Sequence, residues 1–300
     1  GENASAEELG GTHMHSTISG LCDLTANSDQ EAISLAREVI HQAPITNTTL
    51  SQKPNPIDDH ILSLIPQDYR EPTNPTSLIE HLIDSTWLAF KPEFGPSTIT
   101  GFAHISGHPV GIISNQGPID SSGAEKASQF IQLCDQQNRT LIFLQNTTGF
   151  MVGKRQEQSG IVRYGSRLIK AVTNASVAKI TLHIGASFGA GNYAMCSRSL
   201  NPDFIFAWPN NKLSVMGGQQ AAKVMDTISS KKDLLSYQQK RQDLINQYEQ
   251  ESSAVYCSGR LWDDGIIDPR QTRWVFAVCL DIIHQASKTD LKPSQYGTNR

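Results

Sequence analysis

The sequence lacks the features that mark nucleic-acid-binding and membrane-spanning proteins. Its 25 lysines and arginines are balanced by 29 aspartates and glutamates, which gives a formal net charge of −4. No stretch combines clustered lysine and arginine with interleaved aromatic residues, so we expect no nucleic-acid partner. No apolar run approaches the roughly 18 residues that a membrane-crossing helix needs, so we expect no membrane partner either.

Cysteine and histidine are placed too sparsely to indicate a disulfide framework or a metal centre. The cysteines are odd in number and never form a CxxC pair, which is typical of buried thiols in a reducing compartment. His13 and His15 lie two residues apart without a further ligand at metal-binding spacing, so we interpret them as ordinary polar residues and expect no metal. The cysteines are Cys22, Cys134, Cys196, Cys257 and Cys279.

The first residues also lack an initiator methionine and a targeting signal. Gly1-Glu2-Asn3 contains no initiator methionine, and no signal peptide or transit-like segment follows. This beginning is the one expected of a processed or cut chain. The 300 residues suffice for one large domain, or for a domain with an appendage.

Helix and strand signals divide the chain into an N-terminal piece, a proline-rich linker and one α/β body. Residues 1–27 are polar and interrupted by glycines, and Ser28–Glu31 is a capping-box pattern before an apolar helix face. Residues 47–75 carry five prolines among polar residues, as linkers or wrapping segments do. After them strands and helices alternate, which predicts α/β architecture with crossover connections.

Apolar periodicity predicts the individual elements of the body. His183 falls within a buried strand, so we expect its ring to be hydrogen-bonded in the core. The apolar stripe of the last helix is assigned to the core in preference to a subunit interface. Strands are expected at 97–105, 110–114, 140–145, 178–184 and 213–215, the first two as a hairpin, and helices at 77–90, 122–137, 161–172, from 219, 233–251 and 272–285.

Two glycine-rich loops carry the chemistry. The segment 185–193, GASFGAGNY, follows a buried strand and reads as a sharp turn that opens a helix. Small residues leave the first N–H groups of that helix uncovered, which makes the turn a candidate oxyanion hole. The segment 145–153 follows the preceding strand, so neighbouring strands would bring both loops to one sheet edge. The alternative for each loop is an ordinary, tightly packed strand–helix connection.

Other interpretations of the segment 185–193 are less favoured. Gly185–Gly189 matches GxSxG, the nucleophile elbow of serine hydrolases. His284 is the only histidine after Ser187, and it falls in a helical pattern where a catalytic histidine needs a loop. The glycine spacing is not GxGxxG and no Walker lysine follows, which argues against dinucleotide binding.

Together the loops resemble the carboxyltransferase (beta) subunit of biotin-dependent acyl-CoA carboxylases, in particular the methylcrotonyl-CoA and geranyl-CoA members. No single block would carry this resemblance, but five occur in the family's order. The blocks are 101–103 with 108–115, 143–153, 185–196, 214–218 and 260–269. The resemblance implies an α/β fold of the ClpP/crotonase superfamily, a crotonase-like spiral of ββα units.

The resemblance covers mainly the C-terminal domain of such a subunit, and it implies the domain boundaries. Residues 1–45 would end an N-terminal carboxyltransferase domain that is otherwise absent, and 46–76 would be the linker. The C-terminal domain would span 77–290, followed by a tail at 291–300. Since the family's first domain supplies much of the CoA site, this chain alone is expected to be inactive.

The implied function is transfer of CO2 from carboxybiotin to an acyl-CoA of the 3-methylcrotonyl-CoA or geranyl-CoA type. Biotin would arrive on a biotin carboxylase/biotin carrier partner subunit, and the chain would form a homo-oligomer, a hexamer, in the bacterial cytoplasm or the mitochondrial matrix. The alternatives are a propionyl- or acetyl-CoA carboxyltransferase, a biotin-dependent decarboxylase subunit, a serine hydrolase using Ser187, or a non-catalytic assembly fragment.

The resemblance also implies roles for individual residues. The N–H groups of Ala190 and Gly191 would hold the biotin ureido oxygen while the biotin nitrogen takes the substrate's proton, without a metal. Gln219 stands where relatives often have glutamate, which weakens any inference about pocket charge or substrate choice. The residues expected near biotin are Gly149, Phe150, Met151, Gly153, Phe188 and Gly189, and those expected near the acyl-CoA are Met216, Gly217 and Gly218.

Overall fold

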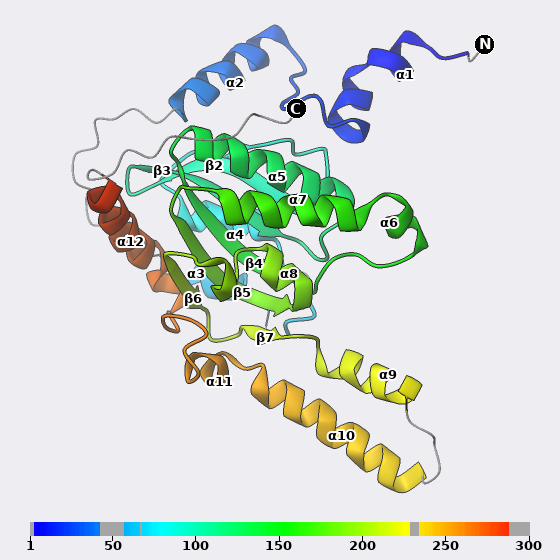
Figure 1. Ribbon diagram of the computed structural model, residues 1–300. Helices are drawn as coiled ribbons and strands as arrows, with labels where there is room; N and C mark the ends of the chain where they lie inside the picture. Colours follow the sequence, from blue (N-terminus) through cyan, green and yellow to red (C-terminus); the bar gives the residue numbers. More distant parts are fainter. Residues whose placement is uncertain (1–2, 43–56, 67, 72, 229–233, 288–300) are drawn as a thin grey trace.

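A mixed seven-stranded sheet carries the fold (Figure 1). Its strands follow the order β1-β2-β3-β4-β5-β6, and β7 pairs with the end of β5. β1, β2 and β3 are antiparallel, whereas every pairing from β3 onward is parallel. The strands are β1 (Leu88–Ala89), β2 (Thr98–Ile105), β3 (His108–Asn115), β4 (Thr140–Thr147), β5 (Lys179–Phe188), β6 (Phe204–Ala207) and β7 (Lys212–Ser214). The computed structural model describes residues 3–42, 57–66, 68–71, 73–228 and 234–287.

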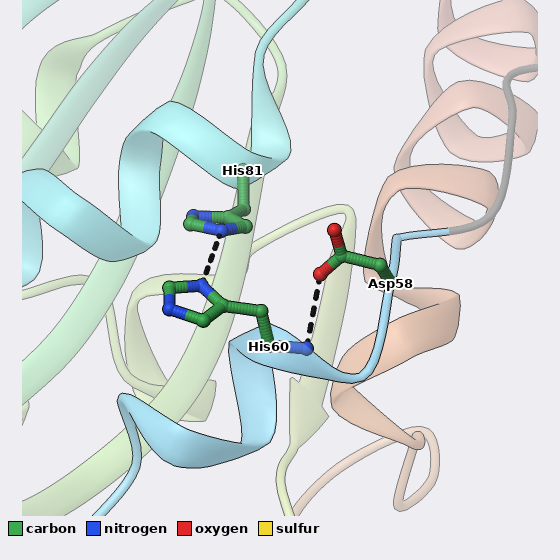
Figure 2. A group of neighbouring side chains, drawn as sticks. All are labelled: Asp58, His60 and His81. Atoms are coloured by element: carbon green, nitrogen blue, oxygen red, sulfur yellow. Dashed lines mark hydrogen bonds between the residues drawn. The ribbon is translucent and has the colours of Figure 1, made fainter.

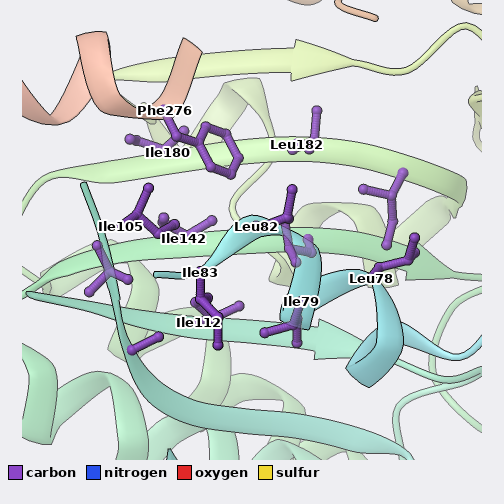
Figure 3. Close-up of a cluster of buried hydrophobic side chains, with 14 of the residues drawn as sticks. Leu78, Ile79, Leu82, Ile83, Ile105, Ile112, Ile142, Ile180, Leu182 and Phe276 are labelled. Atoms are coloured by element: carbon purple, nitrogen blue, oxygen red, sulfur yellow. The ribbon is translucent and has the colours of Figure 1, made fainter. Parts of the chain in front are cut away.

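Helices cover both faces of the sheet. On one face α5 and α7 pack against each other, and on the other lie α3, α4 and α12 (Figures 1 and 3). Side chains along the parallel strands therefore alternate between two cores: Ile142 and Leu144 face α4, and Leu141 and Phe143 face α5. The bounds are α3 (His60–Ser63), α4 (Pro75–Leu82), α5 (Ser121–Gln136), α7 (Ile161–Asn174) and α12 (Thr272–Ser287).

The prediction of a helix at 77–90 is wrong at both ends. α4 begins at Pro75, because Asn74 accepts the N–H of Thr76 at 3.1 Å and proline is favourable as the first helical residue. It ends at Leu82, after which the polar residues 84–86 interrupt the apolar pattern. The chain then joins the sheet as edge strand β1, where the Phe90 N–H donates to the Thr100 carbonyl at 2.8 Å.

The other predicted elements are present with small shifts. α5 begins at Ser121, one residue before the predicted start, and is capped by Asp120, whose carboxylate accepts the Gly123 N–H at 2.6 Å. The four-residue strand β6 was not predicted. Part of the apolar stripe of α12 lies in the core as predicted, since Phe276 and Leu280 are buried, but Trp274, Val278 and Ile282 of the same helix are exposed at 47%, 41% and 50%.

Two helical segments extend from the body in Figure 1. At the N-terminus, α1 (Ala6–Gly10) and a π-helical turn (Met14–Ile18) precede α2 (Asp29–His41), which is capped by Ser28 as predicted. Lys91 holds this segment to the body, since its side chain donates to the Gly20 carbonyl. The second extension is the hairpin of α9 (Gly218–Ile228) and α10 (Leu234–Glu251).

Part of the expected linker belongs to the core. Ile57 and Ile61, which flank the start of α3, are buried against α4 and the sheet. Residues 43–56, 67 and 72 of the predicted linker region, residue 233 of the predicted helix and the predicted tail at 291–300 lie outside the described residues. Among the helices that the structure describes, none has the length and apolar character to cross a bilayer.

Candidate functional site

The two glycine loops leave the sheet side by side. β4 and β5 are parallel neighbours, and their register pairs Leu144 with Leu182 and Thr147 with Ser187. Both loops therefore start at the same edge of the sheet, as the sequence predicted for neighbouring strands. Ligands of open α/β sheets bind at this kind of edge, outside the carboxyl ends of the strands.

The turn after β5 starts later than predicted. Gly185 does not open it, because the strand continues to Phe188 and α8 (Gly189–Ala194) starts at Gly189. A Cβ atom at position 185 would lie 2.4 Å from Oδ1 of Asn146, so glycine at this point in the strand accommodates the present position of the Asn146 side chain. The true corner is Gly189, whose φ of 54° is the left-handed conformation that glycine adopts most easily.

The two loops touch through their backbones. A Cβ atom on Gly191 would lie 2.7 Å from Cα of Gly149 and 3.0 Å from Cγ2 of Thr147, so only glycine permits this approach. The loop at 145–153, which comes first in the chain and is called the first loop below, is held in place by Ile119. The Ile119 N–H donates to the Gly149 carbonyl at 2.9 Å, and the Ile119 carbonyl accepts the Met151 N–H at 2.8 Å. The separation of the loops is thus fixed by main-chain contacts.

The N-terminus of α8 presents main-chain donors at this contact. Ala190 and Gly191 lie in the first turn, where N–H groups have no acceptor within the helix. Ala190 is exposed and Gly191 is buried against the first loop. The helix dipole adds partial positive charge at the same end, which favours an oxygen atom carrying negative charge.

A closed network of neutral side chains supports α8 from below. The Ser187 hydroxyl donates to Oε1 of Gln145, and Nδ2 of Asn192 donates to the same oxygen at 3.0 Å and to the hydroxyl at 2.7 Å. Nε2 of Gln145 donates to the Met195 carbonyl at 2.6 Å. β4, β5 and the C-terminal half of α8 are joined in this way, and sequence reasoning did not identify Gln145 or Asn192 as supporting residues.

This network contradicts the serine-hydrolase hypothesis. The Ser187 side chain is fully buried, and its hydroxyl donates to an amide oxygen and not to a histidine. His284 belongs to α12, on the opposite face of the sheet from α8, and its ring packs against His108 at 5.7 Å. Ser187 is therefore a positioning residue of the turn.

A third segment closes over the corner at Gly189. A Cβ atom on Gly189 would lie 2.9 Å from the Val215 carbonyl oxygen, and one on Gly217 would lie 3.8 Å from the Phe188 ring. Tyr69 stands edge-on to that ring, with centroids 5.7 Å apart. The structure thus brings residues 215–217 together with the loop at 188–191. Met216 in this segment is partly buried, and Gly218 begins α9 against α10.

The remaining residues of the first loop turn away from this contact. Phe150 packs on α7, where a Cβ atom at Gly165 would lie 3.1 Å from its ring. The thioether of Met151 accepts a hydrogen bond from Gln156 at 3.1 Å. Gly153 is exposed and precedes the short helix α6 (Lys154–Gln158), at the far end of the loop.

The loops hold almost no ionisable groups. Within residues 145–151 and 185–195 the only ionisable side chain is that of Tyr193. Beneath them, burial and the charge of Arg198 lower the pKa of His183 to about 4, so its ring is neutral. The expected core hydrogen bond of His183 is wrong, because neither ring nitrogen has a partner among the described residues. Burial and the carboxylate of Glu249 raise the pKa of Tyr69. The site therefore offers main-chain donors and no side-chain base.

Comparison with known proteins identifies relatives along nearly the whole chain. The family model described as carboxyl transferase domain matches residues 1–296. The mitochondrial methylcrotonoyl-CoA carboxylase beta chain of Dictyostelium discoideum is 40% identical over 301 residues, which cover 93% of this chain and 50% of that protein. The chain thus spans about half the length of the curated relatives that it matches.

Two solved structures have a fold similar to that of this chain. The beta subunit of geranyl-CoA carboxylase from P. aeruginosa is 41% identical with a TM-score of 0.76, and the match covers 99% of this chain and 59% of that one. The transcarboxylase 12S hexamer with bound methylmalonyl-coenzyme A is 30% identical with a TM-score of 0.85, and the coverage is again 99% and 59%.

Proposed function

The chain belongs to the carboxyl transferase domain family and has its crotonase-like fold, and from this premise we propose that it carries out the carboxyltransferase half-reaction of a biotin-dependent acyl-CoA carboxylase. The observation that carries the proposal is the contact between the two glycine loops, where Gly191 in the first turn of α8 lies against Gly149. Neighbouring side chains are small or neutral, so stabilisation of an anionic oxygen is the chemistry that this arrangement suits best.

The donor set fits a biotin head group. A ureido oxygen needs hydrogen-bond donors on one side and no competing carboxylate, and Ala190 and Gly191 offer main-chain N–H groups beside a network of amide and hydroxyl groups only. When bound, biotin supplies the carboxyl group and a nitrogen that accepts the substrate's proton. The chain itself then needs no general base, in agreement with the absence of an acid–base pair between the loops.

The residues of this chain orient the reactants and exclude water. The N–H groups of Ala190 and Gly191 stabilise the oxygen that gains charge, and losing one such donor costs about 3 kcal/mol in known oxyanion holes. Phe188, covered by Tyr69 and Gly217, packs behind the donors and keeps water from that side. On the opposite side the main chain of Gly149 lies against Gly191, and hydrogen bonds to Ile119 fix the backbone of this loop, whereas the side chain of Phe150 packs on α7.

For the substrate we propose a 3-methylcrotonyl-CoA or geranyl-CoA type of ester, which the names of the most similar relatives indicate. Met216, Gly217 and Gly218 would contact it, since Gly217 lies beside the Phe188 ring of the donor loop and the other two flank Gly217 in the chain. Gln219 is exposed in the first turn of α9 and adds no charge there. We further propose a biotin-carrying partner subunit and a hexamer, by analogy with the 12S relative.

An amide-to-ester substitution tests the donors directly. Replacing Ala190 by lactic acid removes one N–H and leaves the methyl group, whereas the same replacement at Ala6, in the first turn of α1, is a matched control. In the full-length gene product with its biotin-carrying partner, we expect kcat for carboxylation to fall about 100-fold at position 190. Equal activity of both esters would refute the role of this donor.

The substrate class has a separate test. Initial rates of radiolabelled bicarbonate incorporation would be compared among methylcrotonyl-, geranyl-, propionyl- and acetyl-CoA. We expect kcat/KM to be highest for one of the first two. A preference for propionyl-CoA would instead support the alternative that the 12S relative represents, and would leave the donor assignment intact.

A further inference from the structure

Two imidazoles and a carboxylate from separate segments converge outside the glycine loops (Figure 2). Asp58 and His60 lie at the start of α3, and His81 lies in the last turn of α4. Their ligand atoms all lie within 4.8 Å of one another. Within the described part of the chain, no other group of three histidine, cysteine, aspartate or glutamate residues comes this close.

The orientation of His81 is set by a main-chain carbonyl. Nδ1 of His81 lies 2.8 Å from the carbonyl oxygen of Ser77, and a carbonyl can only accept. Nδ1 therefore carries the proton, and Nε2 of the neutral ring keeps its lone pair. Histidine ligands of metals are usually held by this kind of bond from the other ring nitrogen, which fixes both tautomer and ring orientation.

The lone pair of His81 meets a second ring nitrogen. Nε2 of His81 lies 3.1 Å from Nδ1 of His60, and the rings are stacked with centroids 5.3 Å apart. Two nitrogen ligands at the usual distance of about 2.0–2.1 Å from a tetrahedral metal ion lie roughly 3.3 Å apart. The pair is thus close to the geometry of two ligands of one ion. Binding would require His60 to carry its proton on Nε2, so that Nδ1 is free to coordinate.

The third ligand is held beside the same ring. Oδ1 of Asp58 accepts the main-chain N–H of His60 at 2.9 Å, which keeps the carboxylate next to the imidazole pair. The neighbouring Asp59 forms an ion pair with Arg270 at 3.0 Å instead. The backbone on either side is anchored in the core by Ile57 and Ile61, so the ligands are carried on fixed elements.

We propose that Asp58, His60 and His81 bind one divalent transition-metal ion, with water in the remaining positions. Two imidazoles favour zinc, cobalt, nickel or copper over magnesium or calcium, which prefer oxygen ligands. The ion links α3 to α4 and so fastens residues 57–66 to the body. This site is separate from the donor loops and does not depend on the proposed carboxyl transfer.

Metal titration of the chelator-treated full-length protein tests the proposal. With Zn2+ in isothermal titration calorimetry, we expect one equivalent to bind to the unaltered protein. His60→Ala and His81→Ala should each weaken binding at least tenfold, and Asp58→Asn should weaken it less. Co2+ should give the visible absorption of a tetrahedral site, lost in both histidine variants.

Two variants serve as controls. Asp59→Asn removes a neighbouring carboxylate outside the ligand set, and His104→Ala disrupts the His41–His104 pair, whose rings are 5.5 Å apart. Both should bind Zn2+ as the unaltered protein does. Zn2+ should also raise the melting temperature of the unaltered protein but not that of His60→Ala, which replaces an exposed side chain. Binding that is absent, or that survives both histidine substitutions, would overturn the proposal.

Discussion

The substitution Gly191→Ala tests the contact between the two loops most sharply. It adds one methyl group and removes no hydrogen-bonding group. The new Cβ atom would lie 2.7 Å from Cα of Gly149 and 3.0 Å from Cγ2 of Thr147. Carbon atoms prefer about 3.5–4.0 Å, so the loops must separate by roughly 0.8 Å or more. Cα of Gly149 belongs to backbone that Ile119 holds on both sides, so it cannot yield as a side chain would.

The expected cost falls more on activity than on folding. Overpacking of this kind destabilises a protein by about 1–3 kcal/mol. A displacement of about 1 Å among positioning groups can lower a rate about 100-fold. In the full-length enzyme we therefore expect kcat for carboxylation to fall by one to two orders of magnitude, while thermal melting still shows one cooperative transition.

Gly10→Ala is the matched control, because a Cβ atom there would have no neighbour within 4 Å. It should leave both kcat and the melting temperature unchanged. Normal kcat in Gly191→Ala, measured alongside this control, would refute the inference that the close approach of the loops sets the donor geometry.

Three further predictions concern the network and the cores. Ser187→Ala should keep at least a tenth of the carboxylation rate, because Asn192 still donates to Gln145, and a fluorophosphonate probe should label neither protein. His183→Leu should reduce the loss of unfolding free energy at acid pH. The pKa of His183 is lowered to about 4 in the folded protein, so as pH falls from about 6.5 the unfolded chain takes up the proton first, and the unaltered protein loses about 3 kcal/mol by pH 4. Urea titrations at several pH values measure this loss, and an equal loss in the variant would contradict the prediction. Phe276→Ala should cost about 3–5 kcal/mol in the same titrations and Trp274→Ala much less, whereas equal losses would place the second residue in the core.

The sequence indicates the body of the fold well, because the parallel strands and their helices are long enough to show a period. The predictions from the sequence are wrong where tertiary contacts override local signals. Gly185 resembles a turn residue, but it lies in β5, where it faces the Asn146 side chain. The helix predicted at 77–90 ends early, because polar residues follow Ile83 and the open edge of β2 offers backbone partners to Leu88 and Ala89, which form β1.

Of the candidate site, only the main-chain N–H donors could be predicted from the sequence. Glycine and alanine at 189–191 reveal uncovered N–H groups directly, since small side chains are visible in the sequence. The supporting network is not visible, because Gln145 contacts residues 42 to 50 positions later. The same holds for His60 and His81, which are 21 positions apart and become neighbours only when α3 packs on α4.

The glycines of the donor loop serve different physical needs, and this explains why the motif is denser in glycine than one oxyanion hole requires. Gly185 provides space for Asn146 within the sheet, Gly189 provides the left-handed corner, and Gly191 provides the approach to Gly149. Each need arises from a different neighbour, so none of them can be met by moving a glycine elsewhere in the loop. The proposed anion-binding corner thus depends on the same contacts that hold β4, β5 and α8 together.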